Sequence, residues 1–373
     1  PEILTPVPTT SAPPPAGEAG PGRPSLAARV AAHPLLWPVL ALVVLLAVNV
    51  AASPSFLEVR MQDGHLFGSV IDILRNSAPV MLVATGMTLV IATRGIDLSV
   101  GAIMAVSGAV ALTVIEASPD PGNLGVVFTA IAAAVGVALL LGVWNGFLVS
   151  VLGIQPIIAT LVLMLAGRGV ALLITGGFIT TINSDPYKFI AGGYVLGLPF
   201  AFFVAIFAVI VVGVLERRTA LGMLTEAVGI NPEASRLAGV RSRGIIWGAY
   251  IASGALAGIA GILYSSNIMA ADANAAGLYI ELDAILAVVL GGTSLAGGKF
   301  SLAGTVVGVF TIQTLKSTIT FLGVPPAVSP VFMAAAVLIV VLLQSRRFRA
   351  YFHTAGRSAL RPITRRPDAK VLS

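Results

Sequence analysis

The chain of 373 residues contains no cysteine, only three histidines and few charged side chains. Without cysteine it forms no disulfide, no thiolate metal site and no cysteine nucleophile. The histidines lie outside the apolar runs, which excludes a histidine proton relay or histidine-bound metal within a membrane. Charged residues make up 10% of the chain and hydrophobic residues 57%, whereas a soluble domain carries roughly a quarter charged residues. This composition excludes a soluble protein.

The two ends of the chain differ in composition from its apolar middle. Residues 1–33 are rich in proline and alanine, with almost no large apolar side chains, and predict a disordered tail. Residues 346–373 are rich in arginine and form a basic tail. The expected membrane domain is residues 34–345, and residues 216–243 are its longest hydrophilic segment.

Ten apolar runs are candidates for crossing a hydrocarbon core roughly 30 Å thick. We therefore expect an all-α polytopic membrane protein with about ten transmembrane helices. The runs are residues 35–52, 78–92, 100–115, 124–152, 156–174, 198–215, 244–264, 284–295, 301–321 and 331–343. Residues 284–295 are short and end in glycines, so a discontinuous or re-entrant helix is the alternative there.

The distribution of basic residues predicts the orientation of these runs. Ten crossings place both ends of the chain on one side of the membrane, together with 17 lysine and arginine residues, against three in the opposite loops. By the positive-inside rule, both termini and residues 216–243 are expected in the cytoplasm. The net charge of +6 follows from this topology, so we expect no nucleic-acid partner.

No motif of an enzyme or nucleotide site is present. Residues 291–301 imitate a phosphate-binding loop, but Thr293 replaces a required glycine and Phe300 a magnesium-binding hydroxyl. We expect no catalytic residue, metal or cofactor bound by this chain. Ion-coupled carriers place carboxylates near the bilayer midplane, where the predicted spans have almost none. An ion-coupled secondary transporter of a small polar solute is therefore the weaker alternative, and a membrane-embedded enzyme or scaffold the third.

Four residues interrupt the apolar fourth and fifth runs, namely Trp144, Asn145, Thr160 and Arg168. We predict that they line a solute pathway, and hydrogen bonding between helices is the alternative for the polar groups. A charge at the centre of a span costs about 2.5 to 3.5 kcal/mol. Arg168 is thus expected either to face a polar interior or a carbonyl, or to extend to the outer surface.

Asp97 lies in TRGIDLSVG, which separates the second and third runs. Its carboxylate is placed to accept hydrogen bonds from the amides of Ser99 and Val100, which predicts a structural cap on the third span. Small residues at close-packing spacing predict helix contacts within the subunit, with a homodimer seam as the alternative. They are Gly254, Gly258, Gly261, Gly304 and Gly308.

The segment 226–240 predicts a short helix between the sixth and seventh runs. Asn231 is its N-cap, Pro232 its first position and Gly239 its end, while Glu233 favours the positive end of the helix dipole. A helix of about two turns is stable only on a surface. That surface is the lipid headgroups, the same subunit or a cleft in a partner. The face available for docking consists of Ala234, Leu237 and Ala238.

Four motifs, taken in order, resemble the inner-membrane permease subunits of ATP-binding-cassette importers for monosaccharides, of the ribose and galactofuranose type. They are TRGIDLSVGAIMA, WNGFLVSVLGIQPIIATLVLMLAGRGVALLITGG, GINPEASRLAGVRS and LGGTSLAGGKFSLAGTVVGV. The resemblance runs from about residue 66 to residue 345. The later run LGVPPAVSPVF is more similar to the galactofuranose branch.

The resemblance implies a non-catalytic, multi-pass subunit of the cytoplasmic membrane with the sugar-permease fold. The implied partners are a second permease, identical or paralogous, a cytosolic subunit that binds ATP and Mg²⁺, and an extracytoplasmic sugar-binding protein. The acidic outer loops become candidate contacts for that binding protein. The residues that match the family's ATPase-coupling segment are Asn231, Pro232, Glu233, Ala234, Arg236, Leu237, Ala238 and Gly239.

Overall fold

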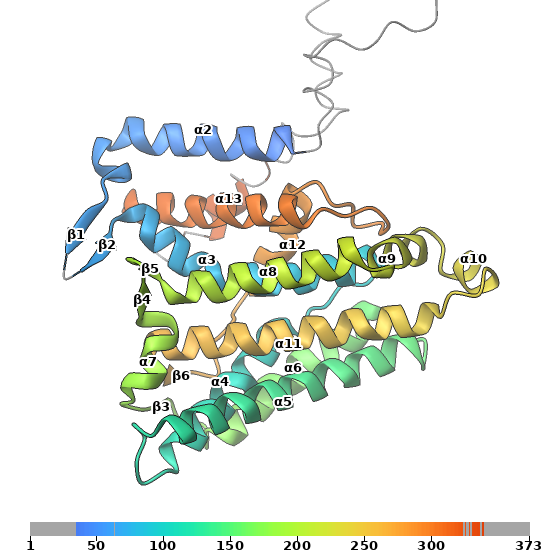
Figure 1. The fold of residues 1–373 in the computed structure, drawn as a ribbon, viewed down its shortest axis with the longest axis horizontal. Helices are drawn as coiled ribbons and strands as arrows, with labels where there is room; N and C mark the ends of the chain where they lie inside the picture. The colour runs from blue at the N-terminus through green and yellow to red at the C-terminus, as the bar shows by residue number, and fades with distance from the viewer. Residues whose placement is uncertain are drawn as a thin grey trace, which may run out of the picture.

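The computed structural model describes residues 35–62, 64–323 and a few positions between 325 and 338, which form an elongated bundle of helices (Figure 1). In chain order the elements are α2 (Leu36–Ala52), the 3-10 helix η1 (Pro54–Leu57), β1 (Arg60–Gln62), β2 (His65–Phe67), α3 (Ser69–Ala92), α4 (Val100–Glu116), α5 (Leu124–Ser150), α6 (Pro156–Ile174), β3 (Thr180–Thr181), α7 (Asp185–Gly192), β4 (Tyr194–Val195), β5 (Leu198–Pro199), α8 (Phe200–Arg218), α9 (Leu221–Ile230), α10 (Pro232–Leu237), α11 (Ser242–Ile268), β6 (Ala270–Ala271), α12 (Ile280–Leu290) and α13 (Leu302–Phe321).

The short elements lie at the two ends of the bundle. Helices α9 and α10 mark one end, which we call the α10 end, and α7 with the short strands marks the opposite, α7 end (Figure 1). The strands form three antiparallel pairs, β1 with β2, β3 with β6 and β4 with β5. The described residues are thus mostly helical, as expected, with these short strand pairs added. Where the chain leaves a helix, its backbone groups find partners in a neighbouring linker instead.

Six described helices are long and apolar enough to cross a membrane, namely α3, α5, α6, α8, α11 and α13. The apolar helices α2 and α4 have 17 residues each. Nine of the ten predicted runs coincide with helices, and the tenth, 331–343, lies largely outside the described residues. Helix α12 has only 11 residues, roughly 16 Å at 1.5 Å per residue. The run at 284–295 is thus a discontinuous helix that begins and ends earlier than predicted.

Helices α3 and α4 form the centre of the bundle. In the most apolar stretch of α3, 78% of the residues are buried, against 17% in α8 and 28% in both α5 and α6. The side chains of Met81, Leu82 and Val83 have no exposed surface. The outer helices instead direct large apolar side chains outward, as expected for surfaces that face lipid or a second subunit.

The helices on either side of the centre make reciprocal contacts. In one group, α11 packs on α4 and α5, and α4 contacts α5. In the other group, α3 packs on α12 and α13, and α12 contacts α13. Helix α3 runs toward the α10 end and α11 runs away from it (Figure 1). Both α4 and α12 begin inside the bundle, where Gly101 faces the backbone of Gly277. Helices α4 and α12 are therefore discontinuous in the sense that a non-helical linker inside the bundle precedes each of them.

Glycines allow these helices to approach closely within the subunit. A Cβ atom added at Gly254 in α11 would lie 2.8 Å from the carbonyl oxygen of Ala138 and 2.8 Å from the Cα of Gly142, both in α5. Gly261 meets the backbone of Met104 in α4 in the same way. The small residues singled out in the sequence therefore pack inside the subunit.

We expect the Gly254→Leu variant to be less stable than the parent chain. The added side chain has to displace the backbone of α5, and overpacking of this kind costs about 1 to 3 kcal/mol. The measurement is the midpoint of thermal unfolding of the detergent-solubilised protein. Gly248→Leu is the matched control, because Gly248 lies in the same helix and has no atom within 4 Å of the added Cβ. Equal midpoints for the two variants would contradict the packing argument.

Candidate functional site

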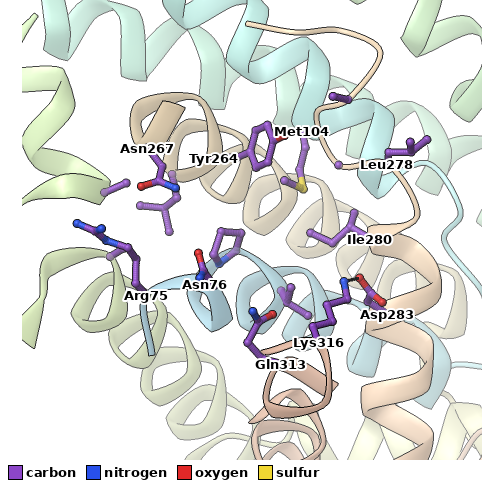
Figure 2. A pocket seen from close by; sticks show the side chains of 17 residues that line it. Arg75, Asn76, Met104, Tyr264, Asn267, Leu278, Ile280, Asp283, Gln313 and Lys316 are labelled. Atoms are coloured by element: carbon purple, nitrogen blue, oxygen red, sulfur yellow. Dashed lines mark hydrogen bonds and ion pairs between the residues drawn. The ribbon is translucent and has the colours of Figure 1, made fainter. Parts of the chain in front are cut away.

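A pocket of about 350 Å³ lies between α3, α11, α12 and α13 near the α7 end, and Figure 2 shows its lining. A second pocket of about 320 Å³ lies between α3 and α13. The two pockets share Asn76, Gln313 and Lys316. We call the two pockets together the α3–α13 groove.

The groove combines amide groups with an aromatic ring. Asn76, Asn267 and Gln313 contribute side-chain amides and Tyr264 contributes a phenol ring. Each amide offers both donors and an acceptor, so the groove can pair with hydroxyl groups in either sense. Met104 and Leu263 provide apolar surface deeper in the pocket. The lining therefore suits a small neutral solute with several hydroxyls and apolar C–H faces.

The charges along the groove cancel. Among the described residues that line it, Arg75 and Lys316 are positive, while Asp72 and Asp283 are negative. The ammonium of Lys316 in α13 donates to the carboxylate of Asp283 in α12 (Figure 2). Arg75 donates to the carbonyl of Gly192 at 3.1 Å. Its guanidinium also lies over the ring of Tyr194, 5.3 Å from the ring centre.

For three of the groove's polar residues, the sequence predicted a different position or no position at all. The predicted spans leave Arg75 as one of the three basic residues of the outer loops and Asp283 as one of the acids of those loops, but the two residues lie in α3 and α12. Helix α3 begins nine residues earlier than the predicted run, because its polar first turns face the groove. Lys316 was overlooked, although a single lysine in an apolar run is itself a signal of a functional position.

Arg168 in α6 holds the segment that forms one wall of the groove. Its guanidinium donates to the carbonyl oxygens of Ala273, at 2.9 Å, and of Ala276. The neighbouring residues Gly277 and Leu278 line the pocket. Of the two expectations for Arg168, the carbonyl contact is the one found. The arginine acts on the groove from behind its wall, because it does not itself line the pocket.

Asn145 and Thr160 hold the linker between α3 and α4. The amide of Asn145 donates to the hydroxyl of Ser99 at 2.7 Å, and the hydroxyl of Thr160 donates to the carbonyl of Ile96 at 3.2 Å. Trp144 is 53% exposed on the outside of α5. The four residues predicted to line a solute pathway are therefore absent from the lining of the groove, and their role in transport stays a prediction.

Asp97 joins this linker to α11. Its carboxylate accepts from the amide of Ser99 at 3.1 Å, from the hydroxyl of Ser99 at 2.6 Å and from the hydroxyl of Ser253 at 2.9 Å. The predicted bond from the amide of Val100 is replaced by the bond from Ser253. Because Asp97 is only 1% exposed, the view that the spans are nearly free of carboxylates is corrected by Asp97, Glu281 and Asp283, all of which are buried.

The predicted short helix is present as α10 at the opposite end of the bundle. Its N-cap Asn231 accepts from the amides of Glu233, at 3.1 Å, and Ala234, at 3.0 Å. The side chain of Leu237 is 79% exposed. A hydrogen bond from Arg236 lowers the pKa of the Glu233 carboxyl, so both groups stay charged at neutral pH. Helix α10 thus presents an apolar side chain and a charged pair to the surroundings.

The comparisons with known proteins agree over most of the chain. Residues 69–342 match the family described as branched-chain amino acid transport system / permease component. The chain is 50% identical over 317 residues to the galactofuranose transporter permease protein YtfT of Escherichia coli (strain K12), covering 84% of this chain and 91% of that protein. It is 44% identical over 317 residues to the fructose import permease protein FruF of Bifidobacterium longum (strain NCC 2705), covering 83% and 87%. It is 35% identical over 312 residues to the ribose import permease protein RbsC of Escherichia coli (strain K12), covering 83% and 92%. No solved structure matches the chain.

We expect Arg168→Ala to loosen the wall of the groove. Each hydrogen bond from a charged donor contributes about 1.5 to 3 kcal/mol. The loss of two should therefore raise the population in which the segment around Ala276 is open by more than tenfold. Because the chain has no cysteine, Ala276→Cys provides a single reporter, and Ala276 is only 6% exposed. The measurement is the rate of maleimide labelling with and without Arg168→Ala.

The control for this experiment is Arg60→Ala. Arg60 is an exposed arginine at the α7 end whose hydrogen-bond partner is Glu58. Its loss leaves the contacts of Arg168 intact, so the labelling rate should not change. Labelling that is equally slow in the Arg168→Ala chain would show that the segment is held in place by other contacts.

Proposed function

The chain belongs to the family of branched-chain amino acid transport system permease components, and we propose that it imports a neutral monosaccharide through the α3–α13 groove. It is a multi-pass membrane permease of a sugar importer of the ATP-binding-cassette class, and it is not itself an enzyme. The resemblance found in the four sequence motifs is therefore confirmed. The observation that carries the proposed route is the pair of adjoining pockets lined by amides with balanced charge.

Size and chemistry both favour a monosaccharide. The pocket between α3, α11, α12 and α13, at about 350 Å³, lies in the range of roughly 300 to 1,000 Å³ that is typical of small-molecule sites. Amides from three helices face it, and the ring of Tyr264 offers a flat apolar surface. The relatives are named for galactofuranose, fructose and ribose, all of which are neutral sugars. The identity of 50% to the galactofuranose permease favours that sugar first.

The two ends of the bundle support the predicted orientation. Arginines cluster at the α10 end, at the close of α8, in α10 and around the start of α11, and the positive-inside rule places such a cluster in the cytoplasm. With the tenth run, 331–343, as a further crossing, both termini lie on that side. The groove then opens toward the outer surface, where the α7 end would receive sugar from a binding protein.

The proposed assembly supplies energy from outside this chain. Helix α10 would dock on a cytosolic ATPase subunit, which holds ATP and Mg²⁺, and a second permease subunit would complete the membrane part. The buried carboxylates revive the question of ion coupling, since such groups bind cations in carriers. However, Asp283 is paired with Lys316, and Asp97 is occupied by two serines. Neither carboxylate is therefore free to bind a coupling ion.

Uptake by the reconstituted complex tests the function directly. We expect galactofuranose, fructose or ribose to enter proteoliposomes only when ATP, the ATPase and the binding protein are all present. Asn76→Ala and Gln313→Ala should each lower uptake about three- to tenfold, since a hydrogen bond contributes about 0.5 to 1.5 kcal/mol. Asn274→Ala, outside the groove, is the control. Uptake by the permease alone under a sodium or proton gradient would overturn the proposal in favour of a secondary carrier.

Leu237→Arg tests the role of α10 in coupling. Truncation of a buried leucine at an interface costs about 2 to 4 kcal/mol, and a buried charge adds to this, so docking should weaken more than tenfold. We expect a permease that is inserted normally but fails to retain the ATPase on purification. Leu196→Arg makes the same change at the α7 end, where Leu196 is 90% exposed, and should retain it. If the Leu237→Arg permease retains the ATPase undiminished, α10 is not the coupling element, and the lipid headgroups become its docking surface.

A further inference from the structure

The ion pair between Asp283 and Lys316 lies where the two parts of the α3–α13 groove meet. Lys316 lines both pockets, together with Asn76 and Gln313, and Asp283 lines the pocket of about 350 Å³. Figure 2 shows the pair at the side of the pocket, with the amide of Gln313 beside it. A solute that passes between the two pockets therefore passes the Lys316 ammonium.

The two members of the pair differ in exposure. The side chain of Lys316 is 41% exposed and that of Asp283 is 12% exposed. The lysine is thus the more accessible member of the pair. The ammonium is accessible to a solute, but its charge is already compensated by its neighbour.

The other charged groups of the groove have separate partners or positions. Arg75 is engaged by the carbonyl of Gly192 and by the ring of Tyr194. Asp72 is exposed in the first turn of α3. Because the Coulomb interaction weakens with distance, the charge balance at the junction depends most on the carboxylate that touches Lys316.

We propose that Asp283 is a specificity-determining residue that makes the groove accept neutral sugars and reject anionic ones such as aldonates. It does so by neutralising the Lys316 ammonium, which would otherwise bind the carboxylate of an aldonate by a charge-assisted hydrogen bond. Specificity then arises because an anionic solute finds no uncompensated positive charge to bind in the groove. The proposal rests on the proposed function of the groove as a sugar route.

A purely structural role of the pair makes different predictions. If the ion pair only holds α12 against α13, the charge of the groove has no effect on which solutes are accepted. Neutral substitutions of Asp283 and Lys316 would then not change the preference between neutral and anionic solutes. If Asp283 sets the selectivity, single neutral substitutions shift the preference in opposite directions. The double substitution restores the parent preference, because the sum of the charges is restored.

The charge of the groove can be measured without transport. Asn76→Cys places a single thiol where both pockets meet, in a chain that has no other cysteine. Its rates of reaction with anionic sulfonatoethyl methanethiosulfonate and cationic trimethylammonioethyl methanethiosulfonate give a ratio that reports the local charge. Asp283→Asn should raise the ratio of anionic to cationic rates roughly tenfold, and Lys316→Gln should lower it by a similar factor. The Asp283→Asn/Lys316→Gln double variant should return it to the parent value.

Two further measurements complete the test. A neutral methanethiosulfonate should react at the parent rate in every variant, which shows that the groove is intact. If Asp283→Asn fails to fold, Lys316→Gln still tests the proposal, because it should lower the ratio of anionic to cationic reaction rates. In the reconstituted complex, an aldonate with the carbon number of the transported sugar should inhibit uptake by Asp283→Asn at roughly tenfold lower concentration than it inhibits the parent.

The outcomes separate this inference from the proposed function. An unchanged ratio in Asp283→Asn and Lys316→Gln, or a double variant that keeps the shift of either single one, would overturn the charge-selectivity role even if the parent complex imports sugar. Conversely, a complex without ATP-dependent sugar uptake would refute the proposed function, while the thiol ratios would still report whether Asp283 sets the charge of the groove.

Discussion

Charged side chains inside an apolar helical bundle need partners, and the centre of this molecule is arranged around that requirement. Breaking a buried ion pair by removing one partner costs about 3 to 5 kcal/mol. Arg168 is held by two carbonyl oxygens, Asp97 by serine hydroxyls and Lys316 by Asp283. Apart from the bond between Ser99 and Asp97, each of these contacts joins two separate helices or linkers. The same contacts that satisfy the charges therefore also place the helices that surround the groove.

The discontinuous helices explain why polar groups can lie so deep. Because α4 and α12 begin inside the bundle, the linkers that precede them carry backbone groups into an apolar environment, where those groups need partners. Arg168 supplies donors to the linker before α12, and Thr160 supplies one to the linker before α4. The linker before α12 then forms a wall of the groove. An interruption that would destabilise an isolated span thus forms part of the proposed binding surface.

Helix α11 connects the two proposed functional regions of the subunit, the α3–α13 groove and α10. Its first residue, Ser242, donates to the carbonyl of Pro232 in α10 at 3.0 Å. Near its other end, Tyr264 and Asn267 line the groove. A 27-residue helix spans roughly 40 Å, so it reaches from one end of the bundle to the other. A displacement of α10 by a docked ATPase would act directly on the helix that carries part of the proposed sugar site.

The sequence determined those features that depend on neighbouring residues or on the mean hydropathy of a whole span. The apolar runs located nine of the described helices, and Asn231 and Pro232 located α10, because an N-cap involves residues only two or three positions apart. The tertiary structure alone decided that the polar first turns of α3 face a groove, that Arg168 binds the carbonyl of Ala273, and that Asp283 pairs with Lys316. Hydropathy records how apolar a run is, but not which face of a helix meets which neighbour. These pairings depend on how segments distant in the chain pack together.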